Sequence, residues 1–600
     1  MKSECARDPA YELAVKAGLD FRPEDNSHLR SGPIADAPFN DALKALLTLS
    51  SRHDFWWPLF RGTARTPRAL IVEDSWGAVA KSLTKHVDNV TAVFPNREDS
   101  ELLQSALAAE TKIDVRISAD PAAEQSIWAA RWPLIVLQRP SSVHGWRDTV
   151  DTARLIERAR ASLTPDGVLI VIEDLKQSLL YRSLAALKRD ERGSDTGLRL
   201  RKLLKLAPDH MVWASLEKLE PTTIQLPELA SRRRESLPGA LREANDIHGL
   251  SRFMALKLAD PRSAVVLSYD KRPATIVDRA LKHPAVVAAS DGQVPELRRV
   301  LAGAGHTTVM LAAPPHRAAN SVVLRIADNP KAATRVKANA SMLNQLASTE
   351  FERITPRILF EERNPPEIYL TVESCLKGRP LLGLTPGPEK DDLLRRAVAR
   401  WNEFRESRID GAIVSSDFFQ AVIGTAVAAI SQYASRDDAE RLVLLAAELK
   451  RRLVGRMWPL GPFHGDFKVG NILMDDRRAI TGVIDWDCSA MTGLPLLDVI
   501  TLAVYEDARD ERRHLAESFT EGVVHGRWRP AYTQMIEDEA ARLGLDSEAQ
   551  DTLKAVFWLV NLRDRVHWIA LSHDLESQRF LSKPLAQLSR LLGVDTRTPN

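Results

Sequence analysis

Cysteine, net charge and long apolar runs are all scarce in this 600-residue chain. Cys5, Cys375 and Cys488 are its three cysteines, too few for a disulfide framework and typical of a protein of the reducing cytoplasm. The 82 Lys and Arg residues balance the 80 Asp and Glu residues, which leaves a net charge of +2. Overall charge therefore gives no sign of a nucleic-acid partner, although it does not exclude a local basic patch.

A membrane-spanning segment is not expected either. The longest uncharged run, FFQAVIGTAVAAISQYA from Phe418 to Ala434, is interrupted by Gln, Thr and Ser. A span needs about 20 mostly apolar residues, so this run predicts a buried helix. The first 21 residues lack the apolar core of a signal peptide. We therefore expect a cytoplasmic protein without membrane or nucleic-acid partners, whose oligomeric state the sequence leaves open.

The N-terminal half alternates strand-length apolar runs with amphipathic segments. From Pro67 onward the runs are ALIVED, NVTAVF, IDVRIS, PLIVLQ and GVLIVIED, with helix-like stretches between several of them. This alternation predicts a mostly parallel sheet covered on both faces. Because the chain is too long for a single core, we assign an extension to residues 1–45 and a doubly wound α/β domain to residues 46–283.

The second half divides into a β-rich and a helical part. LRRVLAGAGHTTVMLAAPPHRAANSVVLRIAD predicts an antiparallel meander whose first turn contains Gly303 and Gly305. A helix, KAATRVKANASMLNQLAS, and a strand, EIYLTVESCLKGRPL, follow. From GPEKDDLLRRAVARW onward the pattern is mainly helical. We expect an α+β, two-lobed architecture with lobes at residues 284–383 and 384–600.

One segment of the helical part carries residues suited to phosphoryl transfer. That reaction needs a carboxylate beside the attacking hydroxyl and hard oxygen ligands for Mg²⁺. In GPFHGDFKVGNILMDDRRAITGVIDWD, residues 461–487, Asp466 and Asn471 share a loop. NILMDD and AITGVIDWD predict a hairpin that brings Asp485 back to the same place. Asp and Asn in a loop often serve only turn formation, but here the elements occur in the expected order.

The pattern H-G-D-x-x-x-x-N followed by I-D-W resembles the catalytic core of the aminoglycoside phosphotransferase and choline kinase superfamily. Its members are similar in fold to protein kinases. The resemblance implies that Asp466 is the catalytic base that positions the hydroxyl. It also implies that Asn471 and Asp485 bind Mg²⁺ and that ATP is the phosphoryl donor. All three side chains would then gather around one divalent cation in an interlobe cleft.

The same resemblance assigns roles to neighbouring residues. His464 would support the loop by packing and hydrogen bonding, and Lys468 would steady the transferred phosphate. GLPLLD resembles the family's G-x-P-x-x-D, which makes Asp498 a structural anchor. Gly465 stands where protein kinases have the arginine of H-R-D. The absence of that arginine favours a small-molecule alcohol as substrate over a protein.

The meander resembles the nucleotide-binding lobe of the family. Gly303 and Gly305 would cover the phosphates, although a two-glycine turn alone is weak support. Arg325 occupies the place of the phosphate-pairing lysine. The following helix usually supplies a glutamate to pair with it, and Asn339 stands there instead. We expect an Arg325–Asn339 pair without the charge assistance of an Arg–Glu pair.

Two further segments complete this interpretation. The backbone from Glu373 to Cys375 would meet the adenine edge, while the Cys375 side chain is interpreted as a small buried hydrophobe. VFWLVNLRDRVHW carries Trp558, Asn561, Arg565 and Trp568 near helical spacing. Such a stripe is more often core than ligand site, but it is the best place to look for acceptor contacts.

The N-terminal half resembles a class I S-adenosylmethionine-dependent methyltransferase over residues 50–270. RALIVEDSWGAVAKSLTKHVDNVTAVFPN resembles the start of that family, and SLTPDGVLIVIED resembles its late strand. S-adenosylmethionine would meet the backbone of residues 75–77, where only Gly77 remains of a glycine-rich turn. Phe94 replaces the acid expected to bind the ribose. These losses favour a degenerate domain over an active methyltransferase.

Three functions follow from these patterns. The leading one is an ATP- and Mg²⁺-dependent kinase that phosphorylates a hydroxyl of a small metabolite. The alternatives are a non-catalytic nucleotide-binding regulatory protein and a bifunctional methyltransferase and kinase. The sequence does not identify the acceptor or distinguish ATP from GTP.

Overall fold

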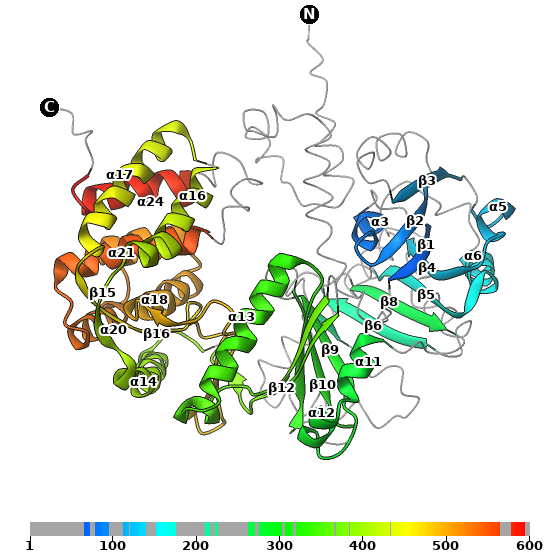
Figure 1. The fold of residues 1–600 in the computed structure, drawn as a ribbon, viewed down its shortest axis with the longest axis horizontal. Coiled ribbons are helices and arrows are strands. Elements are labelled where there is room, and N and C mark those ends of the chain that lie inside the picture. The colour runs from blue at the N-terminus through cyan, green and yellow to red at the C-terminus, as the bar shows by residue number, and fades with distance from the viewer. Residues whose placement is uncertain are drawn as a thin grey trace, which may run out of the picture. The chain divides into compact units, whose positions relative to one another are not determined.

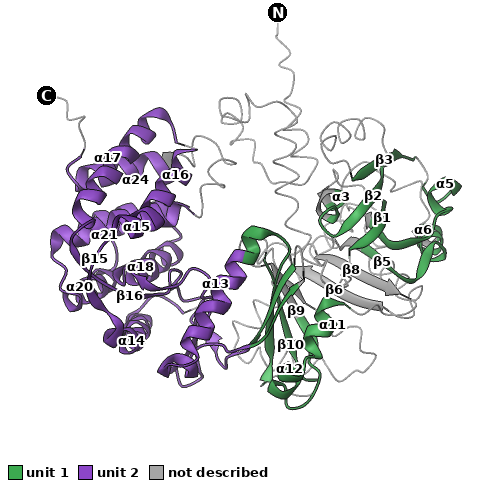
Figure 2. Cartoon of the chain, in the orientation of Figure 1, with its two compact units in different colours: residues 1–21, 37–333, 359–373 green, residues 22–36, 334–358, 374–600 purple. Residues whose placement is uncertain are grey.

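The structure is a computed structural model that describes residues 65–72, 78–94, 112–118, 121–139, 152–175, 210–216, 223–225, 262–269, 275–302, 307–315, 320–364, 368–382, 384–432, 434–563 and 578–594. The chain forms two compact units (Figure 2). Unit 1 comprises residues 1–21, 37–333 and 359–373, and unit 2 comprises residues 22–36, 334–358 and 374–600. The expected extension at residues 1–45 lies outside the described residues.

A 13-stranded sheet runs through the described part of unit 1, in the order β12-β13-β11-β10-β9-β7-β6-β8-β5-β4-β1-β2-β3 (Figure 1). Its strands are β1 Thr66–Val72, β2 Val87–Phe94, β3 Ile113–Ile117, β4 Trp132–Arg139, β5 Leu163–Leu175, β6 His210–Leu216, β7 Thr223–Gln225, β8 Arg262–Tyr269, β9 Glu296–Ala302, β10 Thr307–Ala313, β11 Val322–Ala327, β12 Ile358–Asn364 and β13 Ile368–Ser374.

The part of this sheet from β3 to β5 is parallel, with the order β3-β2-β1-β4-β5 of a doubly wound fold. Side chains of β1 explain why both faces are covered. Ala69 and Ile71 enter one hydrophobic core, and Leu70 and Val72 enter a second core on the opposite face. A strand that is buried on both faces has an unbroken run of apolar residues, as residues 69–72 (ALIV) do. The predicted α/β fold class is confirmed.

Short helices accompany this parallel region. They are α3 Ala78–Leu83, α5 Gln125–Trp128, α6 Thr152–Ala161, α11 Ile276–Leu281 and α12 Pro284–Ala289. Helix α11 begins with a capping box, because the Thr275 hydroxyl accepts the Asp278 N–H and the Asp278 carboxylate accepts the Thr275 N–H. Its apolar face then packs into the same core as Ile71 and Leu324.

The predicted antiparallel meander is present and continues the sheet. Strands β9, β10 and β11 pair antiparallel in succession, and β7 joins β9 antiparallel on the other side. One hydrophobic core contains both Ile71 of β1 and Leu324 of β11. The domain boundary that we expect near residue 284 therefore falls within one continuous sheet and one shared core.

Unit 2 is mainly helical in its described residues. Its helices are α13 Pro330–Leu346, whose first turn belongs to unit 1, then α14 Pro388–Arg405, α15 Ser416–Phe419, α16 Thr425–Ser431, α17 Arg436–Leu453, α18 Leu496–Asp510, α19 Leu515–Ser518, α20 Pro530–Arg542, α21 Ser547–Arg563 and α24 Lys583–Leu591. Short 3₁₀ turns lie at Glu350–Arg353 and Glu406–Arg408, and π turns at Gln420–Gly424, Phe519–Val524 and Gln578–Ser582.

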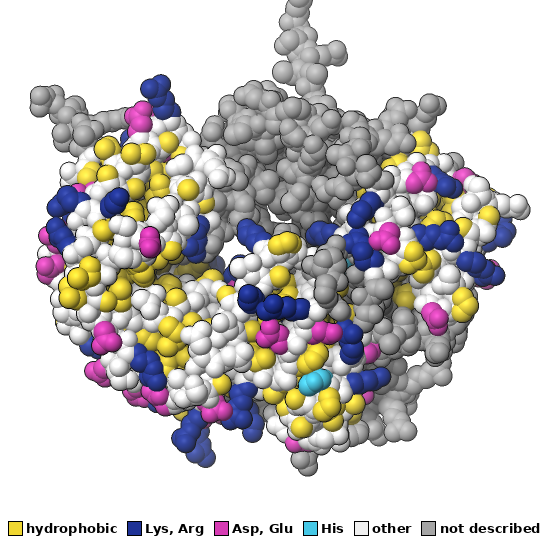
Figure 3. Space-filling view, in the orientation of Figure 1, with side chains coloured by type: hydrophobic (Ala, Val, Ile, Leu, Met, Phe, Trp, Pro, Cys, Tyr) yellow, Lys and Arg dark blue, Asp and Glu magenta, His cyan; other side chains and the backbone are white. Residues whose placement is uncertain are grey.

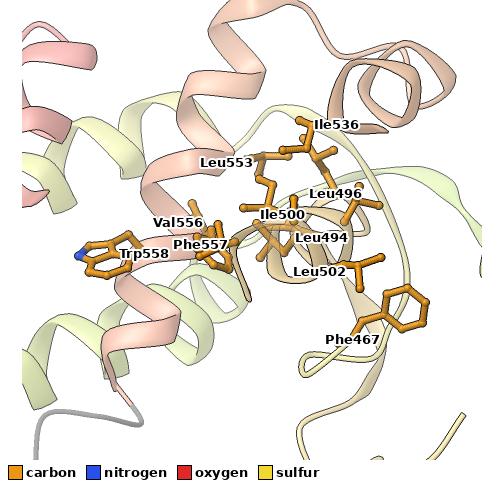
Figure 4. Close-up of a cluster of buried hydrophobic side chains, with 14 of the residues drawn as sticks. Phe467, Leu494, Leu496, Ile500, Leu502, Ile536, Leu553, Val556, Phe557 and Trp558 are labelled. Atoms are coloured by element: carbon orange, nitrogen blue, oxygen red, sulfur yellow. The ribbon is translucent and has the colours of Figure 1, made fainter. Parts of the chain in front are cut away.

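Two small sheets interrupt these helices. One consists of β14 Arg379–Pro380, β17 Ile472–Met474 and β18 Ile480–Val483, and the other of β15 Asp410–Ile413, β16 Met457–Phe463 and β19 Ala490–Gly493. Strands β17 and β18 form the hairpin that the sequence predicted between residues 471 and 487. Figure 4 shows the apolar side chains of α18 and α21 that fill the neighbouring core, among them Ile500, Val556 and Trp558.

The uncharged run at residues 418–434 forms part of this core. It covers the end of α15, a π turn and α16, and it buries Phe419, Ile423, Ala426 and Ile430 at helical spacing. Within the described ranges, no helix has both the length and the apolar character needed to cross a membrane. Basic and acidic side chains are interspersed over the face of the molecule shown in Figure 3.

A buried ion pair links helices α14 and α20. Arg405 and Glu539 are both almost completely excluded from solvent, and the Arg405 Nη2 atom lies 2.6 Å from Glu539 Oε1. Asn402 and Arg542 also donate to the Glu539 carboxylate. A buried carboxylate with several donors is favourable only while all of its partners remain, since each charge left alone in the core is costly.

We expect Glu539→Gln to lower the free energy of unfolding by about 3–5 kcal/mol, because it removes the nearer of the two carboxylates that pair with the buried Arg405 guanidinium. Urea unfolding followed by tryptophan fluorescence measures the change. The matched control is Glu403→Gln on α14, whose exposed carboxylate pairs with Arg400 and should contribute only about 0–1 kcal/mol. Equal shifts in the two variants would show that the buried pair has no special role.

Candidate active site

The candidate site is built on the loop between β16 and β17 and on the end of the following hairpin. Asn471 immediately precedes Ile472, which pairs with Val483 across the hairpin. The Ile484 N–H donates to the Asn471 carbonyl at 2.9 Å. The turn of the hairpin therefore lies at one end, and Asn471 and Asp485 lie together at the other.

Asp466 is the centre of the loop's polar contacts. The Lys468 Nζ atom lies 2.7 Å from Asp466 Oδ2, and the Asn471 Nδ2 atom lies 3.0 Å from the same oxygen. Asn471 Nδ2 also donates to the Asp466 carbonyl at 2.9 Å. The structure thus brings three of the predicted site residues into direct contact.

His464 joins the loop to the strand that carries Asp485. Its Nδ1 accepts the Asp466 N–H at 3.3 Å, and its Nε2 lies 3.1 Å from the Ile484 carbonyl. Since Nδ1 accepts, the proton of the neutral ring must be on Nε2, from which it is donated to the carbonyl. The ring is fully buried and 4.6 Å from the Trp486 ring. Both ring nitrogens are occupied with holding the backbone.

Asp498, in the first turn of α18, holds the start of the loop. Its Oδ2 accepts the His464 N–H at 3.0 Å, and its Oδ1 accepts the Gly465 N–H at 2.9 Å. The Trp401 Nε1–H also donates to it, at 2.8 Å, and Arg405 Nη1 lies 3.4 Å away. Charge-assisted bonds of this kind are stronger than neutral ones, and the helix N-terminus favours the negative charge.

Position 465 requires glycine for steric reasons. Its φ is +80°, and a Cβ atom there would lie 2.2 Å from the Cys488 carbonyl oxygen. The loop can therefore approach the segment after Asp485 only with glycine at this position. The sequence reading treated Gly465 as the absence of an arginine, whereas the structure shows a steric requirement.

Lys468 lies in a negative environment. Burial lowers the pKa of its ammonium group, but Asp466, Tyr505 and Asp485 together raise that pKa by more, so the net shift is upward. The ammonium also lies 5.6 Å from the centre of the Tyr505 ring. The side chain is therefore a fixed positive charge at neutral pH.

The donor set fits a magnesium ion that is bound together with phosphate. Both hydrogens of the Asn471 side chain are directed at Asp466, so its amide oxygen is the atom it offers to a cation. Together with the Asp485 carboxylate, this oxygen would offer two hard ligands to the ion. The described ranges contain no cluster of three His, Cys, Asp or Glu residues that could hold a metal. Mg²⁺ commonly uses one or two protein ligands and takes the others from water and phosphates.

The residues predicted to contact the nucleotide include a buried ion pair within unit 1. Arg325 on β11 and Glu373 on β13 are largely buried, and Arg325 Nε lies 2.8 Å from Glu373 Oε1. The sequence pattern predicts a role only for the backbone of Glu373, and it does not indicate that the Glu373 carboxylate is the partner of Arg325. Cys375 is half-buried, with its Sγ 3.7 Å from the Leu376 carbonyl oxygen, and Gly303 and Gly305 lie outside the described residues.

The aromatic stripe near the C-terminus is core in its described part. Trp558 is fully buried, stacks on Phe519 with ring centroids 4.5 Å apart, and donates from Nε1 to the Phe580 carbonyl. It is therefore not an acceptor contact in this structure. Arg565 and Trp568 lie outside the described residues.

We expect Gly465→Ala to lower the free energy of unfolding by at least about 2 kcal/mol, because left-handed backbone is strained for alanine and its Cβ would clash with Cys488. Thermal unfolding of the purified variant tests this. Gly470→Ala in the same loop is the matched control, since a Cβ there meets no atom within 4 Å. It should change stability by less than about 0.5 kcal/mol, and a similar loss in both variants would contradict the steric argument.

Comparisons with known proteins find a family match and similar structures for the second half of the chain. Residues 296–535 match the family model described as "Phosphotransferase enzyme family". A thermostable mutant of aminoglycoside phosphotransferase APH(4)-Ia in the apo form is 15% identical, over 52% of this chain and 99% of that protein, with a TM-score of 0.35. An aminoglycoside-3'-phosphotransferase of type VIII is 19% identical, over 47% of this chain and 100% of that protein, with a TM-score of 0.33.

The N-terminal half has a weaker likeness. A putative methyltransferase from Pseudomonas syringae is 22% identical, over 24% of this chain and 85% of that protein, with a TM-score of 0.18. No curated protein matches the chain. The fold of the α/β domain is established by its own strand order. The family match at residues 296–535 confirms the resemblance indicated by the loop and hairpin motifs: this region of the chain is similar to the phosphotransferase enzyme family.

Proposed function

We propose that the chain is a small-molecule kinase of the cytoplasm, which transfers the γ-phosphoryl group of ATP to a hydroxyl of a small metabolite with the help of Mg²⁺. The observation that carries the proposal is the contact set of Asp466, Lys468 and Asn471 in one loop that Asp498 anchors. Asp485 stands at the adjoining end of the hairpin. The family match at residues 296–535 supports the same reaction class.

Asp466 is the group that would orient the acceptor. An ionised carboxylate accepts hydrogen bonds only, so an incoming hydroxyl would donate its proton to Asp466 and direct its oxygen at the phosphorus. Positioning of this kind accounts for much of the catalysis in phosphoryl transfer. Gly465 in place of an arginine supports a small molecule over a protein as the acceptor.

Lys468 would stabilise the negative charge of the transferred group. Its raised pKa keeps the ammonium protonated, and its bond to Asp466 holds it in the loop that the acceptor would approach. A protonated amine at this place neutralises charge that spreads over the equatorial oxygens in the transition state.

Asn471 and Asp485 would hold Mg²⁺ through the amide oxygen and the carboxylate. The ion, when bound, neutralises and orients the phosphate oxygens. The loop would hold these two ligands in place. His464 Nε2 bonds to the Ile484 carbonyl, and the Ile484 N–H donates to the Asn471 carbonyl.

Nucleotide contacts are proposed for unit 1. Arg325 would contact the phosphates, supported by its buried bond to Glu373, which fixes the guanidinium on the sheet. The turn with Gly303 and Gly305 would cover the phosphates, and the backbone from Glu373 to Cys375 would meet the base. ATP is proposed over GTP by resemblance to the family alone.

The N-terminal α/β domain is proposed to be a degenerate scaffold. Phe94 ends β2 and is buried in the core that β1 and β11 share, so the residue that replaces the expected ribose-binding acid serves packing. A buried phenyl ring offers no acceptor to a ribose hydroxyl.

We expect Asp466→Ala to abolish phosphoryl transfer while magnesium–ATP binding stays within about threefold of wild type, because the carboxylate acts on the acceptor rather than on the nucleotide. A coupled assay for ADP over a panel of alcohols, aminoglycosides, amino alcohols and sugars, measures turnover. Calorimetry with a non-hydrolysable ATP analogue measures binding.

Asp476→Ala is the matched control, since this aspartate is exposed in the turn of the same hairpin. It should leave both quantities unchanged. Unchanged turnover in Asp466→Ala would overturn the catalytic assignment. Magnesium-dependent ATP binding by the wild type without turnover on any alcohol would favour the regulatory alternative.

We expect no heat of binding when S-adenosylmethionine is titrated into the full chain, because Phe94 occupies the place of the ribose ligand. A thermal shift with the same cofactor provides a second measurement. Binding in the micromolar range would instead support the bifunctional alternative, and methyl transfer to the phosphorylated product would then be the reaction to assay.

A further inference from the structure

Asp485 has a backbone conformation that is uncommon for a residue other than glycine. Its φ is +71°, in the left-handed region, and it is one of few non-glycine residues with positive φ in the described ranges. Aspartate tolerates this region better than most residues, but the conformation is strained. The direction of the Asp485 carboxylate depends on this backbone, so the groups that fix the peptide on each side of Asp485 also fix its ligand atoms.

The peptide before Asp485 is held by the candidate catalytic loop. The Ile484 N–H donates to the Asn471 carbonyl, and the Ile484 carbonyl lies 3.1 Å from His464 Nε2. These two bonds hold the peptide before Asp485 against the loop. A second set of contacts holds the peptide after Asp485.

The peptide after Asp485 is held by helix α13. The Trp486 N–H donates to Asn339 Oδ1 at 2.9 Å, and both residues are buried. Asn339 stands where the family resemblance expects a glutamate. As an amide it offers the same acceptor without adding a third negative charge beside Asp485 and Asp487.

Arg335 makes the second contact from the same helix face, one turn before Asn339. Its Nε lies 2.6 Å from Asp487 Oδ2, and its Nη2 lies 3.7 Å from Cys488 Sγ. Burial lowers the pKa of this guanidinium, but Asp487, Cys488 and Asp485 raise it by more, so the side chain stays charged. Asn339 and Arg335 thus hold residues 486–488 at three points.

We propose that Asn339 and Arg335 are positioning residues, which hold the backbone after Asp485 so that its carboxylate stays in the orientation for binding magnesium. This inference rests on the proposed function for the role of Asp485. In this interpretation Asn339 has a role of its own and does not mark the loss of a functional glutamate. It binds the magnesium-site segment directly, while Arg325 takes its carboxylate partner from Glu373 of the sheet.

The central variant is Asn339→Leu, which keeps a similar volume and removes the acceptor. We expect faster amide hydrogen exchange in the peptide that contains residues 484–488, already without metal or nucleotide. We also expect at least about tenfold weaker binding of Mn²⁺, measured by electron paramagnetic resonance with a non-hydrolysable ATP analogue. The Mg²⁺ concentration for half-maximal turnover should rise by the same factor.

Three further variants make the test specific. Asn344→Leu changes an exposed asparagine of the same helix and should match wild type in every measurement. Asn339→Asp keeps an acceptor oxygen and should restore slow exchange at residues 484–488. Arg335→Gln leaves Asn339 in place and should weaken Mn²⁺ binding, and it carries the test if Asn339→Leu does not fold.

The outcomes separate the two proposals. If the wild type phosphorylates an alcohol but Asn339→Leu and Arg335→Gln show wild-type exchange and Mn²⁺ affinity, the positioning role is wrong and the kinase proposal stands. If the wild type has no activity on any acceptor while the exchange and Mn²⁺ differences appear, the kinase proposal fails and the positioning role stands. Faster exchange without any change in Mn²⁺ affinity would reduce both residues to structural support, which overturns the inference.

Discussion

The carboxylate of Asp498 is the group on which the geometry of the candidate site depends. It accepts the backbone N–H groups of His464 and Gly465 and the indole N–H of Trp401, all from within the core. A buried carboxylate would be unfavourable alone, and these donors together with Arg405 make it tolerable. The position of the loop is therefore set by a charge that cannot move without losing all of its partners.

Short contacts connect the residues that Asp498 holds to the rest of the candidate site. Gly465 lets the loop meet the Cys488 carbonyl, and His464 connects the loop to Ile484. Rings of Phe351, Trp401, Phe467 and Trp486 pack around these polar groups and exclude water. Hydrogen bonds are stronger in such a low-dielectric setting, which explains how a site made of loop residues can be rigid.

The sheet of unit 1 gives the N-terminal half a structural role whatever its ligand. Strand β7 pairs with β9, and one core includes side chains of β1, β2, β11 and β13. Removing side chains of one region from such a core also destabilises the other region, because the close-packed neighbours relax only partly into the cavity that is left. The strands of the α/β domain thus share a sheet and a hydrophobic core with the strands proposed to bind the nucleotide.

Local chemistry made much of this protein predictable. Unbroken apolar runs such as ALIV predicted buried parallel strands, because a strand covered on both faces has no polar side. The hairpin and the contact between Asp466 and Asn471 followed from short spacings, since few residues separate these groups along the chain.

Contacts between distant segments were not predictable in the same way. Nothing near Arg325 indicates that its partner is Glu373, 48 positions away, and nothing near Asn339 indicates the Trp486 N–H, 147 positions away. Such pairs depend on how strands and helices pack, and many residues could satisfy one donor or acceptor. The sequence by itself determined the elements and the loop that bears the chemistry. The tertiary structure alone decided which buried charge or amide each of these residues meets, because that choice is made by packing over long separations.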